Sequence, residues 1–169
     1  MPRTFRDAFW LLLGFWLWLA LLGPIGARWA WAEDPQLARF EQLLHRDVND
    51  FRREHKLIEL ERRSDLDAVA RAHSEDMARR GFFAHENPDG LLWHHRIDRA
   101  GISGYTLAGE NVAQTNEANP NDSVLTGWQN SPDHRANLLA RPFNATGIGI
   151  ARSPDGRLFY TQLYVTFPR

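Results

Sequence analysis

The sequence contains no cysteine. This absence excludes a disulfide scaffold, cysteine-ligated zinc, iron–sulfur clusters and a thiol nucleophile. The chain also lacks an excess of one charge, because 20 Lys and Arg residues nearly balance 21 Asp and Glu residues, for a formal net charge of −1. A near-neutral chain is not typical of a protein that coats nucleic acid, so we predict no nucleic-acid partner.

Strong catalytic motifs are also missing. The sequence has no H-E-x-x-H, G-x-S-x-G or phosphate-binding P-loop pattern. Gly147-Ile148-Gly149 lies in a predicted strand and lacks the third glycine and the following helix of a dinucleotide-binding fingerprint. The chemistry that remains is that of imidazole and carboxylate groups.

The longest uncharged apolar run covers residues 8–22, which is shorter than the roughly 20 residues that a spanning helix needs. Arg3 and Arg6 precede this run, and Ala30-Trp31-Ala32 follows it. A positive start, a short apolar run and an A-x-A site are the parts of a secretory signal peptide, which we predict for residues 1–32.

The alternative is an uncleaved membrane anchor that extends the apolar run to residues 8–27. Either reading predicts a protein that is secreted, periplasmic or held in the cell envelope, and the anchor would add a membrane tether. The remaining residues, 33–169, have the length of one ordinary globular domain. We predict a bacterial protein, because a domain of this length is stable outside the cell without disulfides.

Residue periodicity predicts helices followed mostly by strands. The expected helices cover residues 35–55, 64–80, 91–100, 122–130 and 132–140. Residues 104–113 are expected to be extended, and residues 147–151 and 158–165 to form a hairpin around a turn at 153–156. This order indicates the α+β class, with helices packed on an antiparallel sheet.

Several residues predict where these elements begin and end. Ser64 with Asp67 resembles a capping box, and Gly81 is expected to stop the same helix. Ser131 is expected to be an N-cap, with Pro132 at the first helical position. The four residues from Asn87 to Gly90 predict a tight turn.

Three polar residues are candidates for a functional site. His134 falls in the first turn of a predicted helix, where the positive helix end disfavours protonation, although spacing alone favours an ordinary surface histidine. His85 ends an aromatic run and lies either at a cleft edge or simply at the surface. Glu110 lies in an otherwise apolar segment, so it must be paired, metal-bound or exposed on one strand face.

The other histidines and the tryptophans have simpler interpretations. His73 lies on an apolar helix face, which predicts a hydrogen-bonded core histidine. His94 and His95 are adjacent on a helix, so they cannot both point into one site. Trp93 and Trp128 are expected in the core or in the wall of a cleft.

Four motifs follow one another in a recognisable order. They are Phe82-Phe83-Ala84-His85 with Pro88 and Gly90, then Gly109-Glu110-Asn111-Val112-Ala113, then Trp128 followed by Ser131-Pro132 and His134-Arg135, then Gly147-Ile148-Gly149. Together they resemble the CAP superfamily of cysteine-rich secretory proteins, antigen 5 and plant pathogenesis-related proteins, in its cysteine-free bacterial form. The resemblance covers residues 40–165.

The resemblance implies a three-layer α-β-α sandwich, also called an SCP domain, with a central cleft. It implies cleft residues His85, Glu110 and His134, and we expect Asn111, Trp128 and Ser131 to line the same cleft. The family places a second acid three positions after the tryptophan, where this chain has Ser131. Two imidazoles and one carboxylate resemble a zinc site with an open position for water, so we predict Zn²⁺ or another divalent cation at His85, Glu110 and His134.

Three functions from different classes stay open. The first is an envelope or secreted binding module whose cleft holds a metal, a lipid-like ligand or a peptide. The second is a metal-dependent hydrolase with water bound at His85, Glu110 and His134. The third is a structural interaction domain in which these residues form a polar core network. The missing second acid removes a candidate general base, so we favour the binding module over an enzyme.

Overall fold

The computed structural model describes residues 34–168. The predicted signal peptide or anchor, residues 1–32, lies outside the described residues. The elements in chain order are α1 (Pro35–Glu54), β1 (Glu61–Arg62), α2 (Ser64–Arg80), α3 (Trp93–Arg99), β2 (Leu107–Thr115), α4 (Pro120–Asn130), α5 (Pro132–Leu139), β3 (Ala145–Arg152) and β4 (Leu158–Thr166). Among the helices of this part of the chain, none is long and apolar enough to cross a bilayer.

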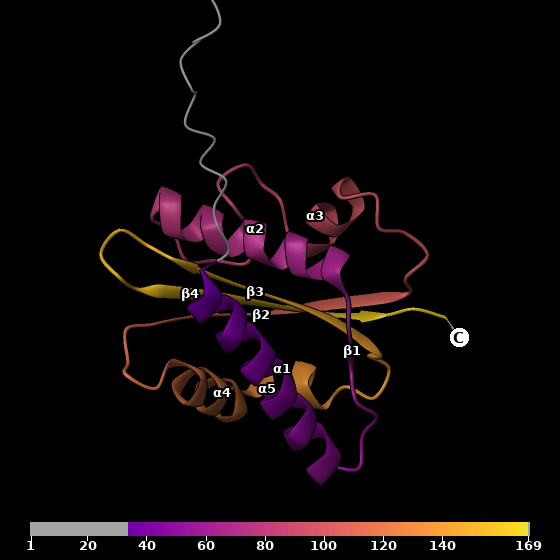
Figure 1. The fold of residues 1–169 in the computed structure, drawn as a ribbon. Helices are drawn as coiled ribbons and strands as arrows, with labels where there is room; N and C mark the ends of the chain where they lie inside the picture. The colour runs from indigo at the N-terminus through magenta and orange to yellow at the C-terminus, as the bar shows by residue number, and fades with distance from the viewer. Residues whose placement is uncertain (1–33, 169) are drawn as a thin grey trace, which may run out of the picture. The chain divides into compact units, whose positions relative to one another are not determined.

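The strands form one sheet in the order β1-β3-β4-β2. Helices α2 and α3 cover one face, and α1, α4 and α5 cover the other (Figure 1). The α+β class and the three-layer α-β-α sandwich are therefore confirmed. The sheet departs from the expected antiparallel arrangement only at its edge, where the two-residue strand β1 runs parallel to β3.

Apolar residues pack on both faces of the sheet. On the α1, α4 and α5 side, Leu44, Val48 and Trp128 pack with residues of β3 and β4. On the α2 side, Leu66 and Ile97 pack against Leu163. Successive side chains of a strand point to opposite faces of the sheet, so the core consists of two layers, one on each face.

Helix α2 ends as the sequence predicts but begins differently. Gly81 adopts the left-handed conformation with φ of 70°, and its N–H donates to the Met77 carbonyl. The predicted capping box is wrong, because Ser64 is already helical and the N-cap is Arg63, without a side-chain cap hydrogen bond. Asp67 instead accepts from the backbone N–H of Ile148 at 2.8 Å and from Arg62 at 3.0 Å.

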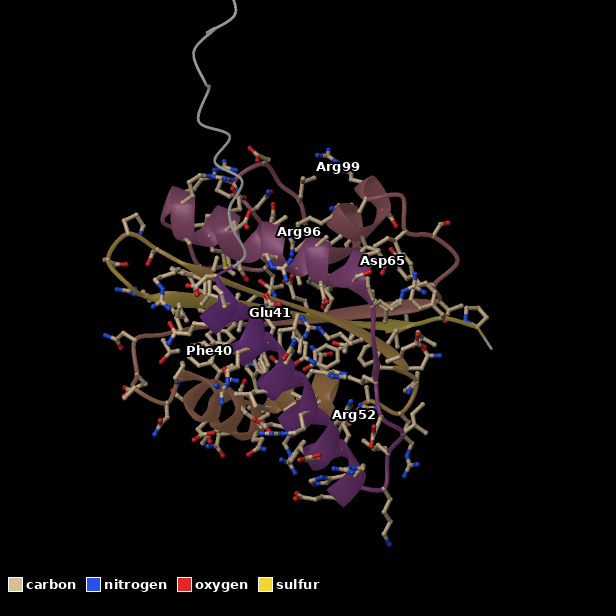
Figure 2. All side chains as sticks on the ribbon, in the orientation of Figure 1. Phe40, Glu41, Arg52, Asp65, Arg96 and Arg99 are labelled. Atoms are coloured by element: carbon tan, nitrogen blue, oxygen red, sulfur yellow. The ribbon has the colours of Figure 1, made fainter. Side chains whose placement is uncertain are left out.

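Two carboxylates thus protect the edge of β3 that the short β1 leaves uncovered. Glu41 of α1 accepts from the Ile150 N–H at 3.1 Å, as Asp67 does from Ile148. Arg62 and Arg71 lie 2.9 and 2.8 Å from the Glu41 carboxylate, and Figure 2 shows Glu41 beside the sheet. Satisfied edge amides avoid both a buried unpaired donor and an open template for strand pairing.

The other predicted boundaries hold in part. Pro132 opens α5 after the N-cap Ser131, as expected, but the Ser131 side chain makes no cap hydrogen bond. Asn87 accepts from the N–H groups of Asp89 at 3.1 Å and Leu91 at 2.9 Å, which confirms the turn. Arg96 of α3 donates to the His85 carbonyl at 2.9 Å, which ties the loop before this turn to α3.

Candidate functional site

His85 and Glu110 come together although 25 residues separate them in the chain. His85 follows α2, and Glu110 lies in β2 with a fully buried side chain. The Nδ1 atom of His85 lies 2.8 Å from Glu110 Oε1. An ionised carboxylate only accepts hydrogen bonds, so Nδ1 carries the proton and a neutral His85 keeps its lone pair on Nε2.

Arg96 of α3 completes the surroundings of Glu110. Its Nη2 pairs with Glu110 Oε2, and its Nη1 donates to the carbonyls of His85 at 2.9 Å and Leu91 at 2.7 Å. Arg96 therefore balances the buried charge and also fixes the loop that carries His85. The sequence offers no spacing signal for Arg96, because the pair forms between two different elements.

His134 of α5 lies beside His85, with 6.3 Å between the ring centroids. Burial, and then the neighbouring His85, lower the pKa of His134, whereas Asp133 opposes this shift. A lowered pKa favours the neutral imidazole, which can donate a lone pair to a metal or accept a proton. His134 and His85 thus form the accessible part of the site, since the His85 side chain is 41% exposed.

Buried amides hold α5 against β2 beneath these rings. Asn111 donates to the His134 carbonyl at 3.1 Å and accepts from Asn137 at 2.9 Å, and Asn137 also donates to the Glu110 carbonyl at 3.1 Å. Asn111 additionally donates to the Tyr164 hydroxyl at 3.1 Å. This network fixes the position of His134 relative to Glu110.

The three residues expected to line the cleft differ in how far they are buried. Asn111 is fully buried, and Trp128 is 2% exposed in the core, where its Nε1 donates to the Val112 carbonyl. These two residues support the site from below because neither presents surface to a ligand. Ser131 is partly buried at the start of α5. Trp93 instead packs edge-on against His85, at 5.8 Å between centroids.

The predicted three-ligand metal site does not fit this geometry. Within residues 34–168, no group of three His, Asp or Glu side chains is arranged to hold a metal ion. The physical reason is that the two carboxylate oxygens of Glu110 already bind His85 and Arg96. Glu110 fits better as the group that orients His85, which leaves the two imidazoles as candidate ligands.

We expect the stability of the domain to depend on pH through His73 and His134, because the pKa of each is lowered. His73 is 1% exposed and its Nε2 donates to the Ala84 carbonyl at 3.0 Å, which confirms the predicted core histidine. Burial is the largest cause that lowers the pKa of His73. Because the unfolded chain protonates first, near pH 6.5, the free energy of unfolding should be fully present above that pH and fall as the pH decreases.

We expect urea unfolding between pH 7.5 and 5.5 to show this fall, with His73 contributing a slope of at most about 1.4 kcal/mol per pH unit. His73→Gln should have a shallower slope than the wild type. Gln42→Ala, at an exposed position of α1 that does not titrate, should keep the wild-type slope. Equal slopes in the wild type and His73→Gln would contradict this expectation.

The fold and the site define a class of protein. An α-β-α sandwich that pairs His85 with a buried glutamate and places His134 beside His85 matches what the sequence motifs imply for a CAP domain. The chain belongs to the cysteine-rich secretory protein family, CAP, whose family model matches residues 45–164. The family resemblance stated from the motifs is therefore confirmed.

Two proteins of Bacillus subtilis (strain 168) are similar in sequence. The uncharacterized membrane protein YlbC is 31% identical over 118 residues, which are 70% of this chain and 32% of YlbC. The uncharacterized protein YkwD is 32% identical over 129 residues, which are 76% of this chain and 48% of YkwD. The chain therefore spans less than half the length of these relatives.

Solved structures show the same fold. An extracellular protein containing an SCP domain from Bacillus anthracis matches with a TM-score of 0.67 and 32% identity, over 76% of this chain and 41% of that one. An outer surface protein from Borrelia burgdorferi matches with a TM-score of 0.70 and 20% identity, over 77% of this chain and 94% of that one. At 20% identity, the second of these matches shows a likeness of fold alone.

Proposed function

We propose that this chain is an exported CAP domain that acts as a binding module, with its functional centre at His85 and His134. The predicted signal peptide or anchor over residues 1–32 supports export. The extracellular Bacillus anthracis protein, at 32% identity, supports the same location. The unidentified ligand of the module would bind where these two imidazoles reach the surface.

One observation carries this proposal, namely the hydrogen bond from His85 Nδ1 to the buried Glu110 carboxylate. It fixes the orientation of the ring and makes Nε2 the lone-pair atom of the neutral ring, on a side chain that is 41% exposed. Metal-ligating histidines commonly donate their other ring N–H to a carboxylate, which increases the basicity of the ligand. Within residues 34–168, no protein group forms a hydrogen bond with His85 Nε2.

A divalent cation such as Zn²⁺ fits these two imidazoles. His85 and His134 would hold the ion, and its other positions would stay available to water or to oxygen atoms of a ligand. The ion would supply a Lewis acid for such oxygens. Glu110 would orient His85, and Asn111 would hold the backbone of His134 in place.

The geometry favours binding over hydrolysis. A general base needs a carboxylate that can reach a bound water, whereas the Glu110 side chain is fully buried and paired with Arg96. The second acid of the family pattern is replaced by Ser131. The structural alternative is a polar network without any ligand, and the buried pair of Arg96 and Glu110 supports it as well. The following experiment distinguishes this alternative from the binding module.

We expect calorimetric titration with ZnCl₂ at pH 7.5 to show one site in the wild type. His85→Ala and His134→Ala should each weaken zinc binding by at least about tenfold, because each removes one of two ligands. His55→Ala, at an exposed histidine just after α1, should bind zinc as the wild type does. Equal affinity in all four proteins, or no binding in the wild type, would contradict the proposal and leave the structural alternative.

A further inference from the structure

His85 lies in a loop whose backbone forms no hydrogen bonds with other backbone groups. The nearest such bonds are made by the N–H groups of Phe82 before it and of Asn87 after it. Within residues 34–168, residues 83–86 take part in none. A binding side chain on an irregular loop is held precisely only if other side chains hold the backbone of that loop.

Two largely buried side chains hold the peptide units on either side of the His85 Cα atom. His73 of α2 donates from Nε2 to the Ala84 carbonyl at 3.0 Å. Arg96 of α3 donates from Nη1 to the His85 carbonyl at 2.9 Å. Both helices cover the same face of the sheet (Figure 1), so the loop of His85 is anchored to one layer of the sandwich.

These two hydrogen bonds fix the direction of the His85 side chain. A peptide unit is planar, so a donor that holds the Ala84 carbonyl also holds the N–H of His85. Between the two anchored peptide units, φ and ψ of His85 are the only soft backbone torsions. Once both are fixed, the Cα–Cβ bond points one way, and the contact of 2.8 Å between Nδ1 and Glu110 Oε1 then sets the rotation of the ring.

Of the two anchors, His73 acts on the loop alone. Arg96 also neutralises the Glu110 carboxylate, so replacing it changes the charge of the site as well as the backbone of the loop. The His73 side chain forms one hydrogen bond within residues 34–168, the bond to Ala84, and its Nδ1 has no partner there. Its contribution can therefore be measured without removing a charge or a candidate ligand.

We propose that His73 is a positioning residue of the histidine site, which keeps His85 aligned by holding the Ala84 carbonyl. This inference rests on the proposed function, because that function is assigned to His85 and His134. Ala84 is exposed, so without His73 its carbonyl can turn to water and accept hydrogen bonds there. Rotation of that peptide unit carries the His85 ring away from the Glu110 carboxylate.

Three substitutions separate the hydrogen bond of His73 from the bulk of its side chain. His73→Leu keeps an apolar body but removes the donor. His73→Asn keeps an amide, but its nitrogen lies one bond nearer to Cα than Nε2 does and falls short of the Ala84 carbonyl. His73→Gln restores the donor, because its amide nitrogen and the histidine Nε2 are the same number of bonds from Cα.

The experiment combines ¹⁵N NMR of the imidazole nitrogens in the metal-free full chain at pH 7.5 with calorimetric titration with ZnCl₂. The wild type and His73→Gln should carry the His85 proton on Nδ1 and bind zinc alike. In His73→Leu and His73→Asn the proton should move toward Nε2, because Nδ1 loses its acceptor, and zinc binding should weaken by at least about tenfold.

Leu158→Ala is the control for a loss of stability alone. Leu158 is buried in β4, and its truncation should lower the free energy of unfolding but leave the His85 tautomer and the zinc affinity unchanged. Wild-type behaviour of His73→Leu and His73→Asn, or an equal loss in Leu158→Ala, would overturn the inference and leave the proposed function intact. The tautomer is measured without zinc, so it tests His73 even where a wild type that binds no zinc refutes the proposed function.

Discussion

Gly149→Ala is expected to destabilise the domain by about 4 kcal/mol or more, at the upper end of what single substitutions cost. Strand β3 passes so close to α2 that a Cβ at Gly149 would lie 2.0 Å from Arg71 N and 2.2 Å from Arg71 Cα. Both atoms belong to the backbone, so relief requires α2 to move away from the sheet. The same close approach occurs at Gly147, where a Cβ would lie 2.2 Å from the Leu66 carbonyl carbon.

The measurement is urea unfolding followed by circular dichroism, with Gly127→Ala as the matched control. Gly127 lies inside α4, and a Cβ there meets no atom within 4 Å. That substitution should stabilise the domain by up to about 1 kcal/mol, because alanine favours helix over glycine. A Gly149→Ala protein within about 1 kcal/mol of the wild type would show that α2 and β3 can separate easily.

The second large effect is expected at the buried pair of Arg96 and Glu110. Arg96→Met leaves a carboxylate with a fully buried side chain and only His85 as its partner, and should cost about 3–5 kcal/mol. Glu110→Gln leaves the Arg96 cation without its counter-charge and should also destabilise the domain. The double variant should lose less than the sum of the two, because no uncompensated charge remains.

The control is the exposed pair of Arg53 and Asp50, whose side chains are 58% and 45% exposed. Arg53→Met should change the free energy of unfolding by less than about 1 kcal/mol. Additive losses in the Arg96 and Glu110 double variant, measured by the same urea unfolding, would mean that the two groups do not interact energetically.

The sequence predicts much of the fold because the relevant signals are local. The periodicity of the helices and the turn at Asn87 depend on neighbouring residues. Gly81 is also a local signal, because the left-handed conformation that often ends a helix favours glycine. The resemblance to the CAP family added the order of the layers, which local signals do not determine.

The parts that the sequence does not predict depend on contacts between distant elements. Asp67 resembled a capping residue, but it binds the Ile148 amide, 81 positions further along the chain. Glu110 was expected to be paired, metal-bound or exposed, and only the fold identifies Arg96 as its partner. The environment of Trp128 could not be predicted for the same reason. Its motif does not show whether the ring faces a cleft or the core, where the structure places it.

The central claim is that Glu110 orients His85 so that its Nε2, together with His134, can bind a divalent cation. The most direct measurement is ¹⁵N NMR of the imidazole nitrogens of His85 and His134 at pH 7.5, before and after addition of ZnCl₂. The account predicts that His85 carries its proton on Nδ1 and that zinc shifts His85 Nε2 and a ring nitrogen of His134. A proton on His85 Nε2, or imidazole signals that zinc leaves unchanged, would contradict it.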